Sequence, residues 1–133
     1  MPGENVEIVK RGFEAFDQGG VEALLEFIHE DFEASTPPGL ASEPDTYRGH
    51  EGVHRYFDSF YEVMDDIRWE SHAFHEVGDK VVVEFTLYAR GKSTGLEFGQ
   101  PAVQVWTLRD DKGIGLELYP TLEEALAAAG DDG

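Results

Sequence analysis

Residues 101–109 carry the pattern that most constrains the fold of this chain. Two sets of side chains alternate there with a period of two, and β-branched and aromatic residues dominate, which is typical of a β-strand. One face holds Val103, Val105 and Thr107, and the other holds Ala102, Gln104, Trp106 and Leu108. The second face combines an amide and an indole with apolar neighbours. It is either the wall of a ligand pocket or part of an ordinary core with one satisfied glutamine.

Hydrophobic periodicity divides the rest of the chain into helices followed by strands. Apolar residues at helical spacing predict helices over 4–18, 21–29 and 49–65. Alternating segments predict strands over 68–76, 80–91, 96–109 and 113–119, and 31–35 is a possible short strand. Short turns between the four later strands predict antiparallel neighbours.

The remaining segments predict a loop and a terminal helix. Pro37, Pro38 and Pro44 exclude regular structure from segment 36–47, which is therefore expected to be a loop. Thr121 and Glu124 have the spacing of a capping box, which predicts a short helix that ends near Ala129. A chain of 133 residues with this order of elements is expected to form a single α+β domain over 1–133.

The charge and the missing cysteines exclude several classes of function. The net charge of −18, from 28 acidic residues against 10 Lys and Arg, should repel nucleic acid and anionic membrane surfaces. The same acidity would also suit a high-salt cytoplasm. The absence of cysteine excludes disulfides, thiol nucleophiles and Cys-ligated zinc. No segment resembles a membrane span or a secretory signal, so we expect a cytoplasmic protein.

A series of short motifs in order resembles the SnoaL-like family of the nuclear transport factor 2-like superfamily. The motifs lie at 4–9, 13–16, 23–25, 29–32, 47–53, 78–83, 105–110 and 124–126. They read ENVEIV, FEAF, ALL, HEDF, YRGHEGV, GDKVVV, VWTLRD and EAL, and together they cover nearly the whole chain. No single motif is decisive, so the resemblance is more specific for a fold than for one reaction.

The resemblance implies a cone-shaped α+β barrel, with three N-terminal helices packed on a curved antiparallel sheet and a short C-terminal helix. The helices and the concave sheet face would enclose a mainly apolar pocket. Members of the family include polyketide cyclases, ketosteroid isomerases, epoxide hydrolases, dehydratases and non-catalytic binders, commonly as homodimers joined through the outer sheet face. In this chain that face would carry a mixed apolar patch, formed by Val82, Thr86, Tyr88, Val103 and Val105.

The resemblance also places candidate pocket residues. Gln104 falls where relatives often place a polar pocket residue, and Trp106 lies two residues along the same face. Relatives often carry an acid at the positions of Thr121 and Thr36, and the isomerases carry a tyrosine at that of Gly12. The expected pocket residues are Gln104, Trp106, Phe16, Phe57, Phe60, Thr36 and Thr121. The three phenylalanines are first of all expected in the core, and some of them could also line the pocket.

No residue stands out as a catalytic base, so the catalytic residues are left unassigned. His75 and Glu117 are strand candidates, but positions on a solvated sheet face are the simpler interpretation of both. His50 and His54 have helical spacing for a metal pair, although a role outside any metal site is the simpler interpretation. We therefore expect no metal and no cofactor.

Three hypotheses for the function follow. The first is an isomerase-like or polyketide-cyclase-like enzyme acting without a cofactor on an apolar carbonyl compound. The second is a non-catalytic protein that binds a small apolar or partly oxidised organic ligand. The third is a dimerisation or interaction domain whose pocket is filled by its own side chains. A base beside Gln104 and Trp106 would favour the first hypothesis, and a polar but base-free pocket the second.

Overall fold

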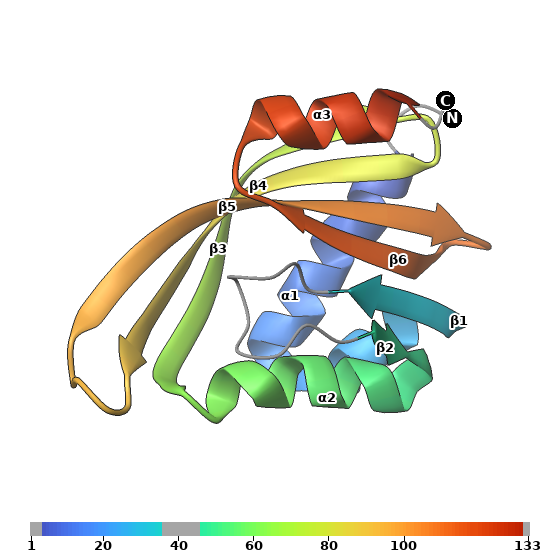
Figure 1. The fold of residues 1–133 in the computed structure, drawn as a ribbon. Helices are drawn as coiled ribbons and strands as arrows, with labels where there is room; N and C mark the ends of the chain where they lie inside the picture. Colours follow the sequence, from blue (N-terminus) through green and yellow to red (C-terminus); the bar gives the residue numbers. More distant parts are fainter. Residues whose placement is uncertain (1–3, 36–45, 132–133) are drawn as a thin grey trace.

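The computed structural model describes residues 4–35 and 46–131 (Figure 1). Helix α1 (Glu4–Leu24) is followed by a 3₁₀ turn, η1 (Leu25–Phe27), and by strands β1 (Ile28–Ser35) and β2 (Thr46–Arg48). Helix α2 (Gly49–Tyr61) precedes the long strands β3 (Met64–Val77), β4 (Lys80–Gly91) and β5 (Glu97–Arg109). Strand β6 (Lys112–Tyr119) and helix α3 (Leu122–Asp131) end the described chain.

The predicted set of three N-terminal helices is wrong. The first expected helix and the start of the second, up to Leu24, together make up α1, in which two helical segments meet at a kink where Gly20 takes a non-helical φ of 72° and ψ of −157°. A residue with a side chain rarely adopts that conformation, so glycine places the kink here. The helical region stops at Phe27, because Ile28 and the residues after it are extended and pair with β6. The helix expected over 49–65 is α2, which ends at Tyr61.

The six strands form one sheet in the order β2-β1-β6-β5-β4-β3. All neighbouring strands are antiparallel except β1 and β6, which are parallel, so the expected fully antiparallel sheet is corrected. The expected closed barrel is also wrong, because β2 and β3 are the two edges of the sheet and do not pair with each other. The general class, an α+β fold with a strongly curved sheet, is confirmed (Figure 1).

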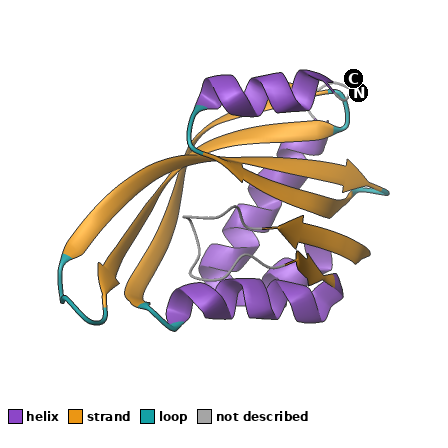
Figure 2. Cartoon of the chain, in the orientation of Figure 1, coloured by secondary structure: helices purple, strands orange, loops and turns teal. Residues whose placement is uncertain are grey.

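Helices cover both faces of this sheet (Figure 2). On the inner face, residues of α1 and α2 pack with Val81 and Val83 of β4 and with Trp106 and Leu108 of β5. On the outer face, α3 packs on β4 and β5 through its small residues, since Ala125 is 0% and Ala129 2% exposed. The alternation along β5 therefore serves two separate clusters of buried side chains.

The outer face differs from the patch that we expected for a dimer. Val82, Val103 and Val105 are buried in the same cluster as Ala125 and Ala129 of α3, so they are covered by the chain itself. Thr86 and Tyr88 lie beyond this cluster. The Thr86 hydroxyl lies 2.6 Å from His72 Nε2, and the guanidinium of Arg68 lies 4.7 Å from the ring centroid of Tyr88. The terminal helix was predicted, but its packing on this face was not.

No helix in the described part of the chain has both the length and the apolar character needed to cross a membrane.

Candidate functional site

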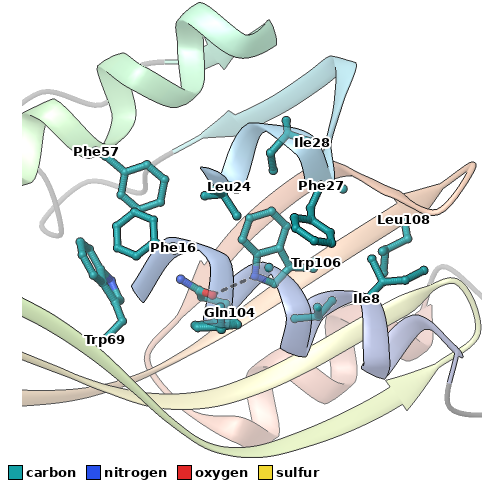
Figure 3. Close-up of a pocket in the computed structure, with 14 residues that line it drawn as sticks. Ile8, Phe16, Leu24, Phe27, Ile28, Phe57, Trp69, Gln104, Trp106 and Leu108 are labelled. Carbon is teal, nitrogen blue, oxygen red and sulfur yellow. Dashed lines mark hydrogen bonds between the residues drawn. The ribbon is translucent and has the colours of Figure 1, made fainter. Parts of the chain in front are cut away.

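A cavity lies between α1 and the inner face of the sheet (Figure 3), and the empty space there, together with the open solvent at its mouth, amounts to about 530 Å³. The kinked helix supplies most of one wall, β5 supplies the opposite wall, and α2 and β3 contribute to one end. The lining residues are Ile8, Val9, Gly12, Phe13, Phe16, Leu24, Phe27, Ile28, Phe57, Trp69, Gln104, Trp106, Leu108 and Gly113. Nearly all of these side chains are apolar, so the cavity suits an apolar occupant.

Gln104 and Trp106 are joined at the β5 wall of the cavity. The Trp106 indole Nε1–H donates a hydrogen bond of 2.9 Å to Gln104 Oε1, and both residues are buried. An indole nitrogen can only donate, so the amide oxygen of Gln104 must be the atom that faces it. The orientation of the amide group is therefore fixed by chemistry, and its –NH₂ group must point the other way.

The amide nitrogen of Gln104 points towards Phe16 and Trp69 (Figure 3). It has no hydrogen-bond partner among residues 4–35 and 46–131. In the same residues, no fully buried side-chain nitrogen or oxygen lacks a partner, so this nitrogen must be open to the cavity. The cavity wall thus presents two N–H donors of a neutral amide.

Three aromatic rings form the part of the cavity that faces these donors. The ring centroids of Phe16 and Phe57 lie 4.8 Å apart, and those of Phe16 and Trp69 lie 5.1 Å apart in an edge-to-face arrangement. Phe57 and Trp69 also meet edge to face at 5.5 Å. Packed aromatic groups of this kind form a rigid apolar surface that fits a ring or a branched hydrocarbon group.

Gly113 of strand β6 lies against the ring of Trp106. A Cβ atom at residue 113 would lie 3.0 and 3.1 Å from Trp106 Cε3 and Cζ3. It would also lie 3.6 Å from Ile28 Cδ1, so the added atom would contact side chains from both β5 and β1. The missing side chain of Gly113 therefore lets the indole lie where it meets Gln104.

The structure brings together four of the seven residues expected at the pocket. Gln104, Trp106, Phe16 and Phe57 all line the cavity. Phe60 packs behind them, with its ring centroid 5.9 Å from that of Trp69, and is not among the lining residues. Thr36 lies outside the described residues.

Thr121 lies at the start of α3, outside the lining of the cavity. It is exposed, and its hydroxyl oxygen accepts a hydrogen bond of 3.2 Å from the backbone N–H of Glu124. The same hydroxyl donates a bond of 3.3 Å to the Glu124 carboxylate. Thr121 thus caps the helix, as the spacing of the two residues indicated.

Several lining residues could not be predicted from the sequence, for a physical reason. Gly12 offers no hydrophobic signal, and Leu24, Phe27 and Ile28 reach the cavity only because α1 is kinked and followed by η1. Trp69 lies in a strand whose inner face could not be assigned from its own alternation. Leu108, by contrast, belongs to the same alternating set as Gln104 and Trp106 and could have been found from it.

The candidate bases lie outside the cavity lining. His75 Nε2 lies 2.9 Å from the Glu84 carboxylate, and both side chains are partly exposed. Glu117 accepts a hydrogen bond from the Tyr119 hydroxyl on an exposed part of β6. Among the described residues, no lining residue carries a carboxylate, an imidazole, an amine or a phenol. The groups that do line the cavity can bind a ligand and donate hydrogen bonds.

His50, His54 and Tyr56 are titratable residues that also lie outside the cavity lining. His50 Nε2 lies 2.9 Å from the backbone oxygen of Ile28, and His54 Nε2 lies 3.2 Å from the Glu22 carboxylate. No group of three or more metal-binding side chains occurs within residues 4–35 and 46–131. Burial, assisted by the neighbouring Tyr47, raises the pKa of the Tyr56 phenol well above its ordinary value.

Comparison with known proteins places this architecture in a family. Residues 9–114 match the SnoaL-like domain family, and the chain belongs to it. A search of proteins with curated functions gave no significant match.

Several solved structures share the fold over nearly the whole chain. A nuclear transport factor 2-like protein of unknown function from Burkholderia pseudomallei is 21% identical, with a TM-score of 0.79 and coverage of 93% of this chain and 95% of that one. A nuclear transport factor 2-like protein from Burkholderia xenovorans is 30% identical, with a TM-score of 0.72 and coverage of 96% and 95%. TerC, co-crystallised with polyporic acid, is 25% identical, with a TM-score of 0.77 and coverage of 96% and 98%.

Proposed function

We propose that this protein binds a small, largely apolar organic molecule through one oxygen acceptor that receives hydrogen bonds from the Gln104 amide. The observation that carries the proposal is the amide nitrogen of Gln104, which opens on an otherwise apolar cavity and has no hydrogen-bond partner among the described residues. A donor in such a place is costly to leave unpaired when a ligand displaces water from it. A ligand with an oxygen acceptor at this point removes that cost.

The lining also limits the charge of the ligand. Gln104 offers neutral donors, which disfavour a cation, and the described lining residues hold no charged group that would balance a buried anion. A ketone, ester, ether or alcohol oxygen meets both conditions. The rings of Phe16, Phe57 and Trp69 suit the hydrocarbon part of such a molecule. The co-crystal of TerC with polyporic acid supports the use of this fold for organic ligands.

A second candidate function is an isomerase-like or cyclase-like reaction on an apolar carbonyl compound. One observation favours it, because the Gln104 donors would stabilise the negative charge that develops on a carbonyl oxygen during enolisation. Such a reaction also needs a base within reach of an acidic C–H bond, and the described lining residues offer none. We therefore place binding first. The open cavity argues against the third hypothesis, a pocket filled by the protein's own side chains.

Two ligands of similar shape test the binding proposal. Acetophenone carries a carbonyl oxygen, and ethylbenzene is its close hydrocarbon analogue. Both tryptophans of the chain line the cavity, so their indole N–H signals in proton–nitrogen NMR spectra report on ligand entry directly. We expect both signals to shift, and acetophenone to bind about 3- to 10-fold more tightly than ethylbenzene, the value of one neutral hydrogen bond. Equal affinities, or signals that stay unchanged with both compounds, would contradict the proposal.

The same sample separates binding from catalysis. In deuterated water, an enzyme that enolises acetophenone would exchange the methyl protons of the ketone for deuterium faster than buffer does. We expect the exchange rate to equal that of buffer, because the described lining residues include no base. Accelerated exchange that is lost with a Gln104 variant would instead establish the second candidate function.

A further inference from the structure

Gly12 lies in the interior of helix α1, is buried, and lines the cavity. Glycine is unfavourable inside a helix, because it loses more backbone freedom on folding than any other residue. Close packing is the usual reason for keeping a glycine at a buried helical position. If close packing were the reason here, a Cβ atom at residue 12 would lie too close to its neighbours.

Packing does not require a glycine at residue 12. A Cβ atom there would lie 3.6 Å from Leu24 Cδ1, 3.8 Å from Phe27 Cβ and 4.0 Å from Phe27 Cγ. These are ordinary van der Waals distances, so alanine fits without a shift of its neighbours. Gly52 of α2 shows the opposite case, because a Cβ atom there would lie 2.6 Å from the backbone carbonyl carbon of Tyr47.

The space left free at Gly12 belongs to the cavity. Leu24 and Phe27, the two residues that a side chain at position 12 would meet first, both line the same cavity. Gln104 and Trp106 on β5 line the opposite wall (Figure 3). A side chain at residue 12 would therefore reduce the cavity volume that is left for a ligand.

We propose that Gly12 is a specificity-determining residue, which sets how wide a ligand can lie between helix α1 and strand β5. This inference rests on the proposed binding function. Because residue 12 has no side chain, the space beside α1 at this point stays free for the ligand. We therefore expect a molecule with two fused rings to be accepted as well as one with a single ring. A larger side chain at this position narrows the cavity and shifts the preference towards the single ring.

The test compares Gly12→Ala with the matched variant Gly130→Ala. Gly130 is also a helical glycine, in α3, and a Cβ atom there would meet nothing within 4 Å. It lies outside the cavity lining, so its substitution reports the effect of helix propensity alone. The probes are acetophenone, with one ring, and 2-acetonaphthone, with two fused rings, and the indole N–H signals again report binding.

We expect Gly12→Ala to raise Tm by about 2–5 °C, because alanine is the better helix former and fits the space. We also expect the affinity for 2-acetonaphthone to fall about 10-fold, a typical effect of one methyl group in an apolar pocket, and that for acetophenone to fall less. Gly130→Ala should leave both affinities unchanged. Gly12→Leu should lower the affinity for 2-acetonaphthone further than Gly12→Ala does.

Three results would overturn the inference. A Gly12→Ala protein with a lowered Tm would show that packing, rather than the ligand, requires the glycine. A Gly12→Ala protein that binds 2-acetonaphthone as tightly as the wild type would show that residue 12 does not limit ligand width, and the proposed function would stand. Wild-type protein that binds neither ketone would overturn the proposed function and this inference with it.

Discussion

The Trp106 indole donates its hydrogen bond to the side-chain oxygen of Gln104, two residues away on the same face of strand β5, at 2.9 Å. This hydrogen bond fixes the arrangement of both side chains at the cavity wall. The indole is satisfied by an acceptor within the wall, and the amide is held so that its two donors face the cavity. An amide can present either its oxygen acceptor or its N–H donors to a ligand, and the contact with Trp106 leaves only the donors facing the cavity, so the site recognises acceptors.

Replacement of Gln104 by leucine should remove both functions of the amide. The buried Trp106 N–H loses its acceptor, so we expect the free energy of unfolding to fall by about 1–3 kcal/mol. The preference for acetophenone over ethylbenzene should decrease, because both amide N–H donors are lost and the freed Trp106 N–H lies at a different point of the wall. Denaturant unfolding and ligand titration measure the two effects. Gln100→Leu is the control, since Gln100 is an exposed glutamine of the same strand. An unchanged preference in Gln104→Leu would argue against the amide contact.

Replacement of Gln104 by glutamate should make ligand binding depend on pH. The introduced carboxyl keeps an acceptor for Trp106 and has nearly the same shape as the amide. Burial disfavours its charged form, which raises its pKa above the ordinary value. Below that pKa the protonated carboxyl donates to a ketone, and above it a carboxylate repels the carbonyl oxygen. Affinity for acetophenone should therefore fall as the pH rises through the raised pKa, whereas wild-type affinity should stay constant over the same range.

Gly113→Ala should disturb the indole without touching Gln104 directly. The new Cβ atom would lie 3.0 Å from Trp106 Cε3, so either the ring or strand β6 must shift. We expect a loss of about 1–3 kcal/mol in stability and a displaced Trp106 indole N–H signal. Gly115→Ala is a matched control on the same strand, because its Cβ atom would meet Thr107 Cβ at an ordinary 3.5 Å. Equal effects of the two substitutions would exclude a specific contact with Trp106.

Thr121→Ala should lower stability and leave ligand binding unchanged. The substitution removes the oxygen that accepts the backbone N–H of Glu124, and the loss of such a helix cap costs about 0.5–2 kcal/mol. Thr121 is exposed and absent from the cavity lining, so the affinity for acetophenone should equal that of the wild type. Thermal unfolding and NMR titration check the two statements. A weaker affinity would return Thr121 to the pocket, where the family resemblance had placed it.

Tyr56→Phe should change stability only at alkaline pH. Burial raises the pKa of the Tyr56 phenol, so the folded chain holds this proton more tightly than the unfolded chain does. The resulting stability is full below the unfolded pKa of about 10 and is lost as the pH rises from there towards the raised folded pKa. Tyr56→Phe should therefore match the wild type at pH 7 and lose stability less steeply above pH 10.

A second tyrosine provides the control for this measurement. Burial, assisted by the neighbouring Asp58, also raises the pKa of Tyr61, but the residue is 41% exposed, so Tyr61→Phe should change the slope less. Urea unfolding at a series of pH values from 7 to 11 compares the variants. Parallel curves for Tyr56→Phe and the wild type above pH 10 would contradict the argument.

The local patterns predicted strands β4 to β6 well, but they missed strand β2, which begins inside the segment expected as a loop. Alternation in 80–91 and 96–109 is strong, and β4 and β5 lie within a residue of those bounds. The two glycines at 19 and 20 predicted a break between helices, and Gly20 is the non-helical residue at which two helical segments of α1 meet in a kink. The end of the second predicted helix was wrong, because the residues from Ile28 onwards pair with β6.

The sequence by itself determined the α+β class, the acidic composition, and the face of β5 that carries Gln104 and Trp106, because alternation and charge are local properties of the chain. Only the tertiary structure decided that α1 lies opposite that face and that α3 covers the three valines on the other face of the sheet. It also decided that a side chain has room at Gly12 but not at Gly113. Those facts depend on the distance between segments far apart in sequence. A cavity is a property of several such distances at once, so no periodicity within one segment can reveal it.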